Sequence, residues 1–199
     1  MASRPVSDEN DIVSVLRDTR GLNGKTIGYG NEKAINQLIA HHTVIFKPDE
    51  QKFWVSTHPY QLGELVAYQT DSIFALSVDR LLRTGGRLPE IAGSIPADSL
   101  LYSEDYKQFV HYRQMCDSLK MAMGNNRVGE GLVDESFVRR FVQTNPEMFQ
   151  VYRLLGDWYQ SRKDYQMAVH YWKTALNKET PRLSEKEYLE KRIRKYQNK

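Results

Sequence analysis

The spacing of apolar residues changes along the chain, and each change predicts a different kind of element. Near the start, Ile12, Val15 and Leu16 recur at i, i+3 and i+4, which predicts a short amphipathic helix over residues 8–18. The following stretch, 21–31, holds four glycines and predicts a loop.

From residue 43 the pattern becomes that of β-strands. Residues 43–46 and 53–56 are rich in β-branched and aromatic side chains, and the Pro-Asp sequence between them predicts a hairpin with a long loop. Residues 62–70 alternate and predict a third strand. The segment 31–42 fits either a helix or a strand, because a short apolar run cannot be assigned by periodicity alone.

A cluster of glycines and prolines at residues 83–101 predicts an ordered linker between two domains. After Ser103 the apolar spacing is helical throughout. Helices are predicted over residues 103–123, 133–144, 146–163, 164–178 and 183–199. The chain is therefore predicted to be α+β, with a β hairpin and sheet region in residues 1–82 and an all-α region in residues 102–199.

Composition narrows the class of protein without naming a function. The chain is 40% hydrophobic and 27% charged, as in ordinary globular proteins, and its net charge of +3 does not call for a nucleic-acid partner. The basic residues at 190–195 fit a solvated helix face. No apolar run reaches the length of a membrane span, and the N-terminus lacks the pattern of a signal peptide. A cytoplasmic location is the default expectation, with export if the chain is a fragment of a longer secreted precursor.

Two of the predicted helices carry residues at the offsets of a repeat. The matching positions are Tyr152, Leu155, Gly156, Tyr159, Ala168, Trp172 and Ala175. This pattern resembles the tetratricopeptide repeat, in which small residues let two helices approach closely and aromatic residues fill the space beside them. The preceding helix pair has Asp134 and Phe141 where alanines belong, so one clear repeat is present. This repeat either packs the helices against one another or forms a groove that binds a partner protein. The groove positions would be Gln150, Arg153, Asp157 and Gln160.

The candidate chemical residues are few. Adjacent residues on a strand point to opposite faces, so His41 and His42 predict one inward and one outward imidazole and no shared metal. Cys116, the one cysteine, falls in the middle of a predicted helix, which indicates a buried and inert thiol. The Gly-Lys-Thr at residues 24–26 lacks the leading glycine of a phosphate-binding loop, because position 19 is threonine. No cofactor is expected.

The stretches "VLRDTRG" and "GYGNEKAINQLIAHHTVIFKPDEQKFWVSTHPYQLGELVAY" resemble a known family over roughly residues 10–75. It is the C-terminal end of the acyl-coenzyme A:6-aminopenicillanic acid acyltransferase-like proteins, which are N-terminal nucleophile hydrolases. The resemblance implies a four-layer αββα sandwich and a cysteine, exposed by self-cleavage, that attacks linear amides through a thioester. Strands 43–46 and 53–56 would be structural or would line the cleft. No cysteine precedes Cys116, so no catalytic residue is carried over.

Three hypotheses for function follow from these observations. The first is the C-terminal part of a linear-amide hydrolase or acyltransferase, inactive alone, whose partner is the missing N-terminal half. The second is a small tetratricopeptide-like module that binds another protein through its helical region. The third is a metal hydrolase that uses His41 or His42 at a cleft.

Overall fold

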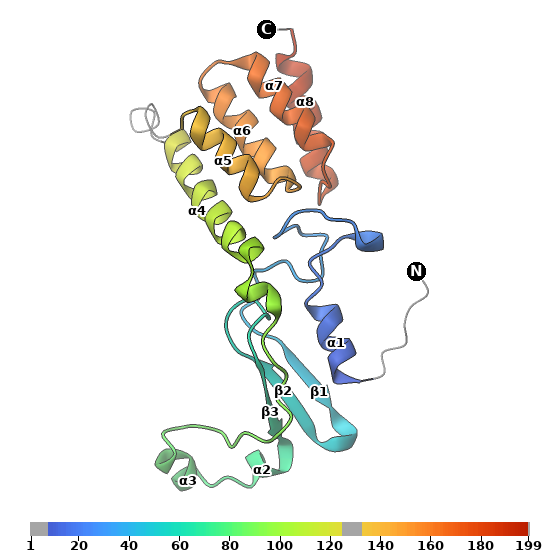
Figure 1. Ribbon diagram of the computed structural model, residues 1–199, viewed down its shortest axis with the longest axis vertical. Helices are drawn as coiled ribbons and strands as arrows, with labels where there is room; N and C mark the ends of the chain where they lie inside the picture. The colour runs from blue at the N-terminus through green and yellow to red at the C-terminus, as the bar shows by residue number, and fades with distance from the viewer. Residues whose placement is uncertain (1–7, 125–132, 199) are drawn as a thin grey trace. The chain divides into compact units, whose positions relative to one another are not determined.

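The computed structural model describes residues 8–124 and 133–198, and the chain divides into two compact units (Figure 1). The first, called here the sheet unit, consists of the segment that ends at Asp18 together with Leu38–Ser103. The second, the helical unit, consists of Thr19–Gln37 and the chain from Glu104 onward. The predicted α+β class is confirmed.

The sheet unit contains a small antiparallel sheet and one flanking helix. The elements are α1 (Glu9–Leu16), β1 (Val44–Lys47), β2 (Lys52–Ser56) and β3 (Leu65–Gln69). The strands lie in the order β1-β2-β3. A tight turn over Pro48–Glu50 joins β1 to β2, and Gln51 ends it with a φ of 52°. The predicted helix and the three predicted strands are all present.

Helix α1 covers one face of this sheet. The buried cluster there consists of Val13, Ile45, Trp54, Leu65, Ala67 and Ile95. Because side chains alternate along a strand, Ile45, Trp54 and Ala67 stand side by side across the three strands. The Arg17 guanidinium closes the end of the cluster, since it donates to the carbonyl oxygens of Gln61, Gly63 and Pro96 at 2.7–3.1 Å.

The predicted linker over residues 83–101 is part of the sheet unit in the structure. Ile95 and Leu65 exchange two backbone hydrogen bonds of 2.9 Å, and the Trp54 indole donates to the Gly93 carbonyl at 2.9 Å. The glycines and prolines give this segment the composition of a linker, whereas its backbone extends the edge of the sheet beside β3. Two short helices before it, α2 (Thr70–Phe74) and α3 (Val78–Arg83), were not predicted.

The helical unit contains the five predicted helices. They are α4 (Glu104–Gly124), α5 (Glu135–Thr144), α6 (Phe149–Ser161), α7 (Tyr165–Leu176) and α8 (Leu183–Tyr196). Figure 1 shows α6, α7 and α8 side by side. The turn between α6 and α7 is tight because Lys163 takes a φ of 64°, and the Asp164 carboxylate then caps α7 by accepting from the Met167 amide at 3.0 Å.

The glycine-rich segment 19–37 belongs to the helical unit, although its position in the chain placed it in the first predicted domain. Beyond a short turn at Leu22–Gly24 it forms neither helix nor strand. A loop was predicted for residues 21–31, whereas the expectation of a helix or a strand from residue 31 onward is wrong for residues 31–37. Asn31 is fully buried and donates to the carbonyl oxygens of Ile27 and Glu179 at 3.0 and 2.9 Å. The Glu179 carboxylate also pairs with Lys33 at 2.6 Å. These bonds fix the segment to the turn before α8.

Candidate functional site

The sheet presents apolar side chains on both of its faces. The residues opposite the α1 side are Val44, Phe46, Phe53, Val55, Val66 and Tyr68. We call this set the open face. The Phe46 side chain is 67% exposed, and the other five are exposed or half-buried. The rings of Phe46, Phe53 and Tyr68 form a ladder across the strands, with centroids 5.8 and 5.3 Å apart.

The segment that follows β3 exposes further large apolar side chains. Phe74, Val78 and Leu82 are 84%, 74% and 73% exposed, and they lie on or beside α2 and α3. Single exposed apolar residues are common on protein surfaces, whereas contiguous groups of them mark interaction sites. The described residues of the sheet unit therefore leave apolar side chains exposed in two places, on the open face and on α2 and α3.

The two adjacent histidines lie outside any regular element. His41 and His42 precede the first residue of β1, and both side chains are exposed. The expectation of one inward imidazole is therefore wrong, because the alternation of a strand does not yet apply at these positions. Neither histidine lines the cavity described below. Among the described residues, no group of three or more histidine, cysteine or carboxylate side chains is placed to hold a metal.

The single thiol has the environment of a structural residue. Cys116 faces the core of the helical unit and is 5% exposed, as expected for an inert thiol. Burial raises the pKa of the Cys116 thiol to about 11. Because the thiolate is the nucleophile, a thiol that stays protonated near neutral pH is a poor one. Burial likewise raises the pKa of the neighbouring Tyr112, whose hydroxyl donates to Gln150 at 2.9 Å.

The residues predicted to pack α6 against α7 meet each other in the structure. A β-carbon added to Gly156 would lie 2.4 Å from the Trp172 indole, so only glycine lets the two helices approach this closely. Trp172, Leu155, Ala168 and Ala175 are completely buried. Tyr152 is 8% exposed and donates to the Pro146 carbonyl at 2.8 Å, and Tyr159 stacks on Tyr171 at 5.4 Å.

The four predicted groove positions are half-buried and engaged by neighbouring helices. Gln150 accepts from a tyrosine of α4, and the other three contact α8. Asp157 accepts hydrogen bonds from Trp172 and Tyr188 at 3.0 and 2.9 Å. Arg153 pairs with Glu185 at 3.1 Å, and Gln160 accepts from an α8 arginine at 2.6 Å. Helix α8 therefore occupies the surface that a partner would need.

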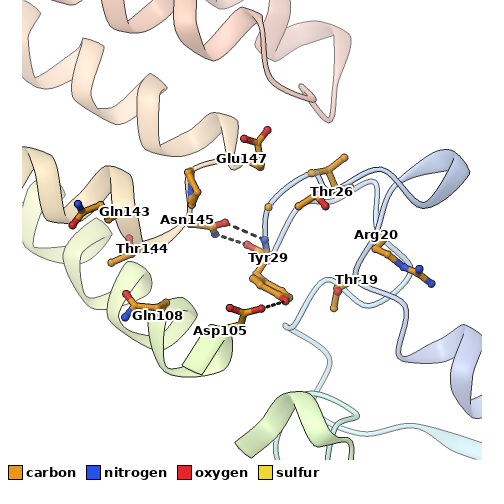
Figure 2. A pocket seen from close by; sticks show the side chains of 13 residues that line it. Thr19, Arg20, Thr26, Tyr29, Asp105, Gln108, Gln143, Thr144, Asn145 and Glu147 are labelled. Carbon is orange, nitrogen blue, oxygen red and sulfur yellow. Dashed lines mark hydrogen bonds between the residues drawn. The ribbon is translucent and has the colours of Figure 1, made fainter. Parts of the chain in front are cut away.

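A cavity of about 500 Å³ opens within the helical unit between segment 19–29, the start of α4 and the turn that joins α5 to α6 (Figure 2). Its lining mixes hydroxyl, amide and carboxylate groups with a few apolar side chains. The residues are Thr19, Arg20, Thr26, Ile27, Gly28, Tyr29, Asp105, Gln108, Gln143, Thr144, Asn145, Pro146 and Glu147. Figure 2 shows the Tyr29 ring reaching toward Asp105, whose carboxylate accepts from the Tyr29 hydroxyl at 2.9 Å.

Two side-chain arrangements hold the wall of this cavity in place. The Asn145 amide group bonds the backbone of Tyr29 twice, accepting from its N–H at 3.1 Å and donating to its carbonyl at 2.8 Å. Gly28, at a φ of 85°, lies so close to Met148 that an added β-carbon would be 2.6 Å from the Met148 backbone. Sequence reasoning missed this cavity, because its residues come from a loop and two helix ends that are far apart in the chain.

No family model, no curated protein and no solved structure matches the chain. Within the part of the chain that the structure describes, no helix has both the length and the apolar character needed to cross a membrane.

Proposed function

We propose that the sheet unit is one layer of the αββα sandwich of an N-terminal nucleophile amidase or acyltransferase. A second sheet, from outside the described residues, would cover the open face and carry the nucleophilic cysteine. The observation that supports the proposal is a sheet that is apolar on both faces and that, in the described part of the chain, has a helix packed on one of them.

The two faces of an antiparallel sheet usually differ in polarity. Such a sheet normally turns one face to the core and one polar face to water, so its strands alternate apolar and polar residues. Here Val44, Phe46 and Phe53 take positions that this rule assigns to polar residues. Fully burying one such side chain stabilises a fold by about 1.5–3 kcal/mol. Two sheets that pack face to face about 10 Å apart would bury the whole set.

The chemistry must then come from the covering layer. Cys116 is buried, protonated and part of the helical unit, so it does not match a nucleophile at a new N-terminus. The proposed role of this chain is to support the catalytic layer and to line the cleft for a linear amide substrate. The resemblance of residues 10–75 to the acyltransferase-like family supports the same role.

The helical unit supports a second candidate function, a tetratricopeptide-like module for protein–protein interaction. Gly156 and Trp172 form the close helix contact that such a repeat requires. The groove positions Arg153, Asp157 and Gln160 are already engaged by α8, however, and this favours a packing role for the repeat. We therefore rank the interaction module second.

An activity assay on the native assembly tests the first proposal. The tagged full chain would be purified under native conditions from the cells that produce it and assayed with a panel of fluorogenic N-acyl amides. We expect hydrolysis that iodoacetamide abolishes, that a Phe46→Asp chain fails to recover, and that a Cys116→Ala chain retains. Absence of hydrolysis, or hydrolysis that requires Cys116, would contradict the proposal.

A further inference from the structure

The cavity of the helical unit has the properties of a built binding site. Its volume of about 500 Å³ falls within the range of roughly 300–1,000 Å³ that small-molecule sites occupy. Its wall is an irregular segment, and such a segment stays in place only when specific contacts hold it. Asn31 and Asn145 are both almost fully buried, and the side-chain amide of each forms hydrogen bonds with the backbone of this segment. Buried polar groups satisfied in this way make a rigid wall.

The charges around the cavity favour a cationic ligand. The Asp105 carboxylate stands at the cavity, where one of its oxygens accepts from the Tyr29 hydroxyl. Glu147 is neutralised by Lys178, whose ammonium group lies 2.9 Å from its carboxylate. The Arg20 guanidinium lies beside Gly24, and Figure 2 shows its side chain pointing away from Asp105. Arg20 remains one of the lining residues, so the negative charge that the cavity offers to a ligand is that of the exposed Asp105 carboxylate.

We propose that this cavity binds a ligand that carries a primary ammonium group, with Asp105 as its counter-ion. The ammonium would bond the Asp105 oxygen that does not accept from Tyr29, and the Thr19 hydroxyl and the Gln108 amide line the cavity nearby. The Tyr29 ring, Ile27 and Pro146 offer apolar contact to the methylene groups that precede the charge. A lysine side chain of a peptide and a free diamine share this chemistry.

Isothermal titration calorimetry on the full chain distinguishes a peptide lysine from a free diamine as the ligand. The probes are cadaverine and the peptide acetyl-Gly-Lys-Gly-amide, with the same peptide acetylated on the lysine side chain as the uncharged control. We expect the charged probes to bind and the acetylated peptide not to bind. Tighter binding of the peptide would assign the site to a peptide, and equal binding would assign it to a free amine. If neither charged probe binds, the proposal is overturned.

Two variants and a control test the role assigned to Asp105. Asp105→Asn keeps the shape and removes the charge, and it should weaken binding by about tenfold, since charge-assisted hydrogen bonds are the strong ones. Tyr29→Phe leaves the carboxylate in place and should change the affinity by about twofold or less. Asp117→Asn removes an exposed carboxylate farther along α4 and should leave the affinity unchanged. Equal affinity of Asp105→Asn and the natural chain would overturn the proposal, even if the variant is less stable.

Discussion

The two units of the chain differ in how completely they bury their own apolar side chains. In the helical unit Phe141, Leu155 and Trp172 are fully enclosed by neighbouring helices. In the sheet unit a buried cluster lies beneath α1, whereas Phe46 and Phe74 are 67% and 84% exposed. Both units also expose single apolar side chains, and the difference between them is the open face, where such side chains stand side by side on neighbouring strands. We propose that this face receives another layer.

The largest expected effect comes from a matched pair of substitutions on neighbouring residues of β1. Ile45→Asp places a charge in the cluster beneath α1 and should lower the free energy of unfolding by more than about 4 kcal/mol. Phe46→Asp places the same charge on the open face, where it should change that free energy by less than about 1 kcal/mol. Urea unfolding followed by circular dichroism measures both. Equal losses would mean that the open face is part of the core.

Removing the central indole of the helical unit should have an effect nearly as large. Trp172→Ala leaves a cavity between α6, α7 and α8 and should lower the free energy of unfolding by about 3–5 kcal/mol. Thermal unfolding followed at 222 nm measures the loss, with the exposed Lys173→Ala on the same helix as the control. A loss below about 1 kcal/mol would show that this unit does not rest on its own core.

A smaller loss of the free energy of unfolding is expected for a substitution at the contact between α6 and α7. Gly156→Ala introduces a methyl group that would overlap the Trp172 ring, so the helices must separate, and the cost should be about 1–3 kcal/mol. At an open helix position the same change stabilises a helix, because alanine is the better helix former. Gly124→Ala, at the end of α4 with nothing within 4 Å, provides that comparison. Stabilisation by Gly156→Ala would refute the close contact.

The smallest effect concerns the acid dependence of the segment fixed to the helical unit. Hydrogen bonds from Lys33 and Lys25 hold the pKa of Glu179 below its ordinary value. The carboxylate therefore stabilises the fold above the ordinary pKa and loses this contribution as the pH falls through the lowered one. Because these groups are partly exposed, Glu179→Gln should lower the free energy of unfolding by less than about 1 kcal/mol at neutral pH and by less at pH 2. Urea midpoints at the two pH values measure the difference, and a larger cost at pH 2 would contradict this sign.

Much of the fold could be predicted from local patterns, and the parts that could not depend on distant contacts. Apart from the short helices α2 and α3, the helices and strands followed the spacing of apolar residues. The closeness of Gly156 to Trp172 followed from a known packing rule. The place of residues 83–101 in the sheet unit could not be predicted from the sequence, because only the folded sheet shows that Ile95 pairs with Leu65. The cavity was missed for the same reason: Tyr29 and Asn145 are 116 residues apart in the chain.

We propose that a second sheet covers the open face, and photo-cross-linking from Phe46 tests this most directly. The full chain, with p-benzoylphenylalanine in place of Phe46, would be expressed in the cells that produce it and irradiated, and the cross-linked polypeptide would be sequenced from its N-terminus. The proposal predicts a polypeptide that begins with cysteine, and no such product when the probe replaces the exposed Val110 of α4. Cross-links from position 46 only to a second copy of this chain, or to polypeptides without an N-terminal nucleophile, would contradict it.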